Sequence, residues 1–118
     1  MAAHNDLGTK GEALAKSYLE DKGYRILEIN WVYARAEVDI IAYHDKRIIF
    51  VEVKTRTSVD YGQPEEFVGY AKERNLKRAA EQYIYWKNFN GEIRFDIIAI
   101  LFNKLGEHTL RHIEDAFW

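Results

Sequence analysis

Hydrophobic positions recur along the first half of the chain with two different periods, which predict a helix and then three strands. Leu7, Ala15 and Leu19 recur at helical spacing, so residues 7–22 are predicted to form a helix that Gly23 ends. Three segments rich in β-branched and aromatic residues follow, and each is short enough to be a single strand. The predicted strands cover residues 24–30, 37–43 and 47–54.

The second half of the chain repeats the succession of helix and strands. Polar residues 55–63 are predicted to form a loop, and a helical stretch runs from about Pro64 to Lys87, with Gly69 as a break. Two further strands are predicted over 93–102 and 108–113, separated by a turn at 103–107. This order of elements predicts an α/β fold with a central mixed β-sheet flanked by helices.

Length and composition fit a single domain over residues 1–118, with 47% hydrophobic and 31% charged residues. The chain has no cysteine, which excludes disulfides, thiolate zinc sites and a cysteine nucleophile. No apolar run is long enough to span a membrane, and the first residues lack the pattern of a signal peptide. We therefore expect a cytoplasmic protein without a membrane partner.

The strand predicted over residues 47–54 carries charged side chains where an apolar strand should be buried. Side chains alternate along a strand, so Phe50, Glu52 and Lys54 share one face. An acid and a lysine at the end of a central strand destabilise the fold unless they are paired or bind something. This strand is therefore the first place to look for chemistry.

The preceding strand supplies a second carboxylate. The polar turn His44-Asp45-Lys46 predicts a hairpin, and pairing about a turn centred on Asp45-Lys46 sets Asp39 opposite Glu52. Opposed carboxylates on a sheet repel, and a divalent cation between them would turn that repulsion into a binding site. Taken singly, Asp39 reads as a solvated strand end and Glu52-x-Lys54 as a surface ion pair. Their combination favours a metal site.

The expected roles follow from the chemistry of hard cations, which take carboxylates, waters and substrate phosphates as ligands. Mg²⁺ is such a cation, and the carboxylates of Asp39 and Glu52 are its expected ligands. Lys54 could hold the attacking water or the phosphate. Glu12, in the glycine-containing segment before Ala13, is a fourth candidate for the catalytic set.

These residues resemble a known family. Asp39 followed by Glu52-Val53-Lys54 resembles the signature of the PD-(D/E)xK, or restriction-endonuclease-like, superfamily. More closely, the chain resembles the YraN-like uncharacterised bacterial family over nearly its whole length. The segments that carry this likeness are Gly8 to Glu12, Asn30, Glu37 to Ala42, Phe50 to Arg56, Gly62, Arg94 to Asp96 and Ile113 to Phe117. One departure is Ala36, at a position where the family usually has glycine.

The resemblance implies a restriction-endonuclease-like core with Mg²⁺ or Mn²⁺ as the cofactor between strand carboxylates. The metal-binding positions that it implies are Asp39, Glu52 and Val53. The chain is also similar to archaeal Holliday-junction resolvases, in which a glutamate of the first helix joins the aspartate, glutamate and lysine. That likeness carries over to Glu12, Asp39, Glu52 and Lys54 of this sequence. The implied function is a metal-dependent endonuclease that hydrolyses DNA phosphodiester bonds, on branched or damaged DNA.

Basic residues elsewhere are candidates for contacts with a nucleic-acid backbone. Lys72, Arg74, Lys77 and Arg78 form a basic run in the second helical stretch, of which Lys77 and Arg78 are the preferred phosphate contacts. Arg56, just beyond the strand with the acids, is a stronger candidate because of its position. A solvated helix face explains the basic run equally well. The further candidates for the site are Glu37 and Gln82.

Charge and the remaining polar residues leave other readings open. The net charge of −2 and pI of about 6.1 count against a tight nonspecific binder of duplex DNA. A non-catalytic nucleic-acid-binding module, or a scaffold in a DNA repair or uptake complex, is the alternative. Arg94 and Asp96 are expected to form an ion pair, and the histidines are expected to be structural. Cutting both strands of a junction symmetrically would need a homodimer.

Overall fold

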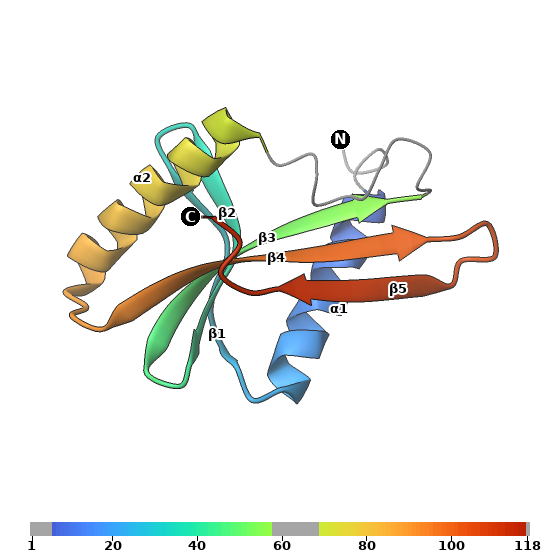
Figure 1. The fold of residues 1–118 in the computed structure, drawn as a ribbon, viewed down its shortest axis with the longest axis horizontal. Coiled ribbons are helices and arrows are strands. Elements are labelled where there is room, and N and C mark those ends of the chain that lie inside the picture. The colour runs from blue at the N-terminus through green and yellow to red at the C-terminus, as the bar shows by residue number, and fades with distance from the viewer. Residues whose placement is uncertain (1–5, 58–68, 118) are drawn as a thin grey trace.

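The computed structural model describes residues 6–57 and 69–117, which form two helices and five strands (Figure 1). The elements are α1 (Asp6–Asp21), β1 (Arg25–Tyr33), β2 (Ala36–His44), β3 (Arg47–Arg56), α2 (Tyr70–Lys87), β4 (Glu92–Phe102) and β5 (His108–Ile113). The described helices include none that is long and apolar enough to cross a membrane.

The five strands form one mixed sheet in the order β1-β2-β3-β4-β5. Strands β3 and β4 are parallel, and the three other neighbouring pairs are antiparallel. A parallel pair needs a crossover, which here contains α2. The helices cover opposite faces of the sheet, α1 against β1 and β3 and α2 against β1 and β2 (Figure 1). The predicted fold, a restriction-endonuclease-like α/β core, is confirmed.

The element boundaries differ from the predictions by a few residues. Strand β1 continues to Tyr33 and β3 to Arg56, so the loop predicted from residue 55 is wrong for its first two residues. Helix α2 begins at Tyr70 with Gly69 as its N-cap. The predicted helix start at Pro64 lies outside the described residues, as does Gly62.

The hairpin between β2 and β3 has the predicted register. Asp45 and Lys46 both adopt positive φ, 54° and 68°, and His44 pairs with Arg47 across them. Two consecutive residues with positive φ are typical of a type I′ turn, whose twist matches that of a hairpin. Ile40 pairs with Val51 further along, as pairing about this turn requires.

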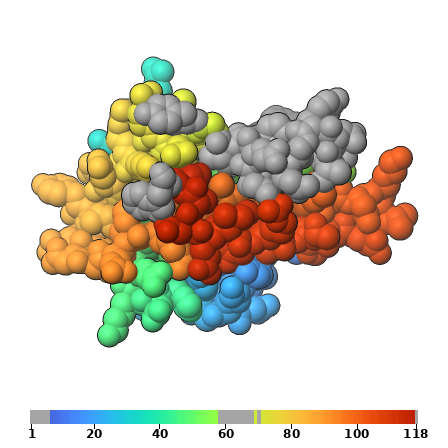
Figure 2. Space-filling view, in the orientation of Figure 1, coloured from blue at the N-terminus to red at the C-terminus, as the bar shows by residue number. Residues whose placement is uncertain are grey.

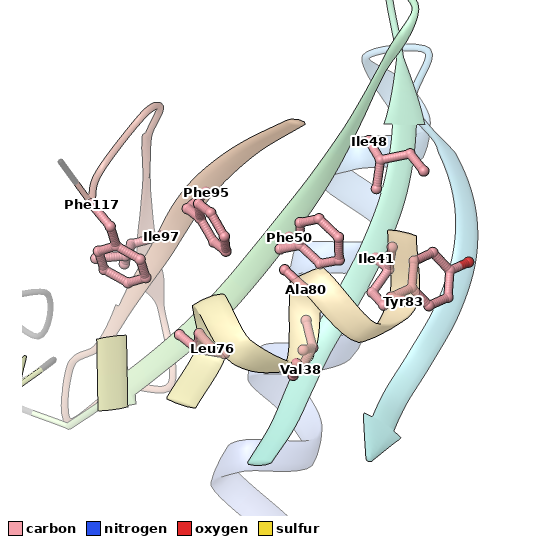
Figure 3. Packing of buried hydrophobic residues seen from close by; sticks show 11 residues of the cluster. Val38, Ile41, Ile48, Phe50, Leu76, Ala80, Tyr83, Phe95, Ile97 and Phe117 are labelled. Atoms are coloured by element: carbon pink, nitrogen blue, oxygen red, sulfur yellow. The ribbon is translucent and has the colours of Figure 1, made fainter. Parts of the chain in front are cut away.

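The face of the sheet covered by α2 holds an aromatic core (Figure 3). The rings of Phe50 and Phe95, on the parallel strands, stack with centroids 5.5 Å apart. Tyr83 of α2 meets Phe50 edge to face at 6.0 Å. Burial of three such rings fixes how α2 lies across β2 and β3. The N-terminal end of α2 is thereby held near the strand ends that carry the acids.

The opposite face contains a buried polar network centred on Asp96. Arg94 donates two hydrogen bonds to this carboxylate, at 2.9 and 2.8 Å, and Asp115 donates a third from its backbone at 3.1 Å. His112 Nε2 lies 2.7 Å from Asp96 Oδ2, and its Nδ1 is 3.1 Å from the Tyr18 hydroxyl of α1. Burial alone would raise the pKa of Asp96, but these hydrogen bonds hold it below its usual range. The predicted Arg94–Asp96 ion pair is confirmed.

Helix α1 approaches the sheet most closely at Gly11. A Cβ atom built on Gly11 would collide with Thr55 Oγ1 and lie 3.2 Å from Thr55 Cβ. Only glycine lets the helix backbone come this near to β3. The approach places the next residue, Glu12, beside the end of β3 that carries Glu52 and Lys54.

This close approach predicts different effects for two glycines of α1. Gly11→Ala should lower the free energy of unfolding by about 1–3 kcal/mol, because the new methyl group pushes α1 away from Thr55. Gly8→Ala is the matched control, since its Cβ would meet nothing within 4 Å. Alanine in a helix should raise the free energy of unfolding there by up to about 1 kcal/mol. Urea unfolding measures both, and equal effects would contradict the packing.

Candidate metal centre

The candidate site forms where the pairing of β2 with β3 stops. The last paired residues are Ile40 and Val51. Beyond them, the backbone N–H of Val53 donates to the side chain of Asp39, with 2.8 Å between N and Oδ2. A carboxylate therefore takes the place of the next backbone partner in the ladder. Asp39 and Glu52 lie at the start of this gap between the strands.

The side chains of β2 do not alternate regularly between the two faces of the sheet through Asp39. Val38 and Ile41 both pack in the core on the α2 side, whereas Ile40 and Ala42 pack on the α1 side. Regular alternation would put Val38 with Ile40. From Asp39 back to Ala36, β2 pairs with β1 alone. Two-stranded ribbons twist more than wide sheets, and this extra twist accounts for the lost alternation.

Glu52 is the most unusual residue of the site, because it is a buried acid with only half of its hydrogen-bonding capacity used. It is 3% exposed. Its Oε2 atom lies 3.1 Å from Lys72 Nζ and 3.9 Å from Lys54 Nζ. Its Oε1 atom is the one buried side-chain oxygen or nitrogen of the described residues that has no hydrogen-bond partner. A buried oxygen in this state lowers stability, so it needs an explanation.

Burial and the nearby Glu52 both disfavour the charged form of Asp39. Burial raises the pKa of Asp39 to about 7, and repulsion from Glu52 adds to the effect. The hydrogen bond from Val53 and the charge of Lys72 oppose this rise only in part. Near neutral pH, the fold therefore holds Asp39 partly protonated, which a divalent cation would reverse.

Glu12 and Glu37 extend the acidic site toward α1 and solvent. Asn30 of β1 adopts φ of 53° and donates from Nδ2 to Glu12 Oε1 over 3.3 Å. Burial, and repulsion from Glu37 and Glu52, raise the pKa of Glu12 despite this hydrogen bond. Glu12, Asn30 and Glu37 line a cavity of about 270 Å³ together with Gly8 and Thr9. Glu12 thus lies close enough to Glu52 and Asp39 to repel both electrostatically.

Two lysines face the acids. Partial burial lowers the pKa of Lys54, although the charge of Glu52 works against this. Burial would also lower the pKa of Lys72. There, however, the attraction of Glu52 is stronger, so the pKa of Lys72 is raised. Lys72 was not among the predicted site residues. Its spacing could have identified it, since Lys72, Leu76 and Tyr83 lie on one helical stripe and the last two are buried.

The remaining predicted residues lie around this centre. Arg56 ends β3 and donates to the backbone carbonyl of Thr55 at 2.8 Å. Lys77 pairs with Glu73 of the same helix at 3.8 Å. Arg78 lines a cavity beside the β1–β2 turn. Gln82 is ten residues beyond Lys72, which corresponds to about 15 Å along the axis of α2.

The donor set fits a hard divalent cation that keeps several waters. Asp39 and Glu52 offer carboxylates, with one buried oxygen of Glu52 unused by protein groups. In residues 6–57 and 69–117, no three acidic or histidine side chains converge closely enough to enclose an ion by themselves. Mg²⁺ commonly binds through one or two carboxylates with water and phosphate as further ligands.

The five-stranded mixed sheet and its two helices define an α/β protein with a restriction-endonuclease-like core. Residues 11–100 match the model of a family described as Uncharacterised protein family UPF0102. A UPF0102 protein of Flavobacterium psychrophilum is 48% identical over 118 residues, covering 100% of this chain and 98% of the relative. One from Chlorobium chlorochromatii is 41% identical, covering 96% and 92%. One from Bacteroides thetaiotaomicron is 40% identical, covering 100% and 97%. The chain therefore belongs to the UPF0102 family, and the YraN-like resemblance is confirmed.

The raised pKa of Asp39 predicts how stability depends on pH in metal-free protein. Its folded pKa of about 7 exceeds the ordinary value of 3.8, so the folded state binds the proton more tightly. Stability should therefore fall as pH rises from about 4 to 7. Asp39→Asn removes this loss and keeps an acceptor for Val53. It should be more stable than the natural chain at pH 8 by on the order of 1–3 kcal/mol, and by less at pH 5.

Urea unfolding in EDTA at the two pH values measures this difference. The exposed helical acid Glu81 provides a control of equal charge, because Glu81→Gln should change stability little at either pH. Mn²⁺ should stabilise the natural chain and not Asp39→Asn. An advantage of Asp39→Asn that does not change with pH would contradict the assignment.

Proposed function

We propose that this protein is a metal-dependent endonuclease that hydrolyses DNA phosphodiester bonds, with Mg²⁺ or Mn²⁺ as its cofactor. The observation that supports the proposal most directly is the buried Glu52 carboxylate, whose Oε1 has no partner in the described structure. It stands beside Asp39, an acid with a raised pKa. Such a pair is costly in a protein that does not bind a cation.

The proposed metal ligands are the carboxylates of Asp39 and Glu52. Val53, the next residue of β3, is the third proposed metal-binding position. When bound, a divalent cation would supply the acidity that activates a water molecule and the charge that stabilises the phosphate oxygens. Glu12 is the fourth proposed member of the site, and its carboxylate would orient a water molecule from the side of α1.

Two lysines have distinct proposed tasks. Lys54 Nζ, 3.9 Å from Glu52 and with a lowered pKa, would hold the attacking water and receive or return a proton. Lys72, closer to Glu52 and with a raised pKa, would remain charged. Its ammonium group would balance Glu52 in the metal-free protein and a phosphate in the complex. Arg56, Lys77 and Arg78 remain proposed contacts to the DNA backbone.

A non-catalytic nucleic-acid-binding module is the second candidate. The observation that favours it is the ion pair of Lys72 with Glu52 at 3.1 Å, because an ammonium group already compensates the acid. In that case, DNA binding would not require a divalent cation. Affinity would fall steeply with salt and with the loss of Arg56, Lys77 or Arg78.

Substitution of the acids separates the two candidates. With Mg²⁺ or Mn²⁺, the natural chain should nick branched or damaged DNA. Asp39→Ala, Glu52→Ala and Lys54→Met should each reduce the rate at least about a hundredfold, because each removes charge or a proton-transfer group at the phosphate. Glu81→Gln should leave the rate unchanged. Gel assays of cleavage measure the rates, and circular dichroism shows that each variant folds. Cleavage at an unchanged rate by both alanine variants would contradict the nuclease assignment.

A further inference from the structure

Two cavities lead away from the candidate metal centre along α2. The first, of about 200 Å³, is lined by Glu37 and Lys72, and Lys72 pairs with the buried Glu52. The second, of about 290 Å³, is lined by Tyr33 and Arg78. Their shared lining residues are Arg35, Ala36 and Asn75. The acids are therefore connected to a second polar cavity between the β1–β2 turn and α2.

Two arginines from different elements meet at this second cavity. Arg78 comes from α2, and Arg35 comes from the turn that joins β1 to β2. Both are exposed, and neither has a carboxylate partner within residues 6–57 and 69–117. The turn holds its shape through the pairing of Tyr33 with Ala36. Figure 1 shows it beside α2, and Figure 2 shows it (cyan) projecting past the helix.

The charge of α2 differs in sign from that of the whole chain. The helix carries five basic and two acidic residues, whereas the chain has a net charge of −2. Asn75 adds an amide to the two guanidinium groups at the cavity. Guanidinium groups with free donors match the oxygens of a phosphate. The cavity thus fits a phosphodiester group, and only the first cavity separates it from the candidate metal centre.

A row of aromatic rings begins at the same cavity. Tyr33, which lines it, stacks on Trp31 with centroids 6.4 Å apart and an interplanar angle of 11°. Trp31 stacks on Trp86 of α2 at 6.3 Å and 19°. Trp86 is 58% exposed, and Lys87 Nζ lies 4.4 Å from its ring centroid. The rings are therefore nearly parallel and open to solvent at Trp86.

We propose that Arg35, Arg78 and the ring row of Tyr33, Trp31 and Trp86 bind single-stranded DNA beside the candidate metal centre. The arginines hold a backbone phosphate, and unpaired bases stack on the exposed aromatic surface. Duplex DNA cannot use the rings, because its bases are already stacked on one another. The inference rests on the proposed endonuclease function and gives its substrate class: DNA with a single-stranded segment next to the cut.

The arginines are tested by binding of labelled oligothymidylate to the full chain in EDTA, which prevents cleavage. Arg35→Ala/Arg78→Ala should weaken binding roughly tenfold at low salt and reduce the slope of log affinity against log salt by about 1. Lys16→Ala/Lys104→Ala removes two positive charges from α1 and the β4–β5 turn and should leave the slope unchanged. Equal losses in the two double variants would overturn the proposal.

The aromatic row is tested by two neighbouring residues of α2. Trp86→Ala should weaken oligothymidylate binding roughly tenfold, as expected for one lost base–ring stack, with little effect on a duplex. Tyr85→Ala is the matched control, because Tyr85 is 81% exposed and belongs outside the stacked row. Equal effects of the two variants, or tighter binding of duplex than of single strand, would overturn the proposal. So would a dimer that Trp86→Ala dissociates while DNA affinity stays unchanged.

The binding measurements test the single-strand surface independently of the proposed nuclease activity. If the acid variants still cleave DNA while Arg35→Ala/Arg78→Ala and Trp86→Ala weaken single-strand binding, the catalytic assignment falls and the binding surface stands. If the acid variants lose cleavage while the arginine and tryptophan variants bind like the natural chain, the binding surface alone is wrong.

Discussion

The structure of this site depends on the repulsion between two carboxylates that the fold holds at one point of a sheet. Pairing of β2 with β3 ends at Ile40 and Val51, and Asp39 takes the next backbone N–H. Glu52 is buried beside it, with one oxygen bound by lysines and one without a partner in the described structure. The burial of two like charges and the unpartnered oxygen of Glu52 both lower stability in the metal-free protein. Their coincidence is explained most simply by a cation site.

Other parts of the fold bring further charged groups to this point. Gly11 allows α1 to approach Thr55, and Glu12 thereby joins the acids from one side. The aromatic contacts of Phe50 with Tyr83 fix α2 on the other side, where Lys72 reaches Glu52. The Asp96 network lies on the α1 face and connects β4, β5 and α1. It stabilises the scaffold, while Glu52 Oε1 at the strand gap has no partner in the described structure.

Much of the fold could be predicted from local pattern because turn chemistry and periodicity agree with tertiary structure here. The hairpin about Asp45 and Lys46 set the register that brings Asp39 to Glu52. The loss of alternation at Val38 could not be predicted, because it depends on where β3 stops pairing with β2. Lys72 was predicted only as a member of a basic run, because the sequence does not show which member of that run reaches the acids. The position of Arg35 at the second cavity could not be predicted, because Arg78, which lines the same cavity, is distant in sequence.

The central claim is that Asp39 and Glu52 form a divalent cation site, and calorimetric titration with Mn²⁺ tests it most directly. We expect one binding site in the natural chain, with affinity that increases as pH rises through the Asp39 pKa of about 7. Glu52→Gln, which keeps the size of the side chain, should abolish the binding heat. No binding at millimolar Mn²⁺, or equal binding by Glu52→Gln, would contradict the account.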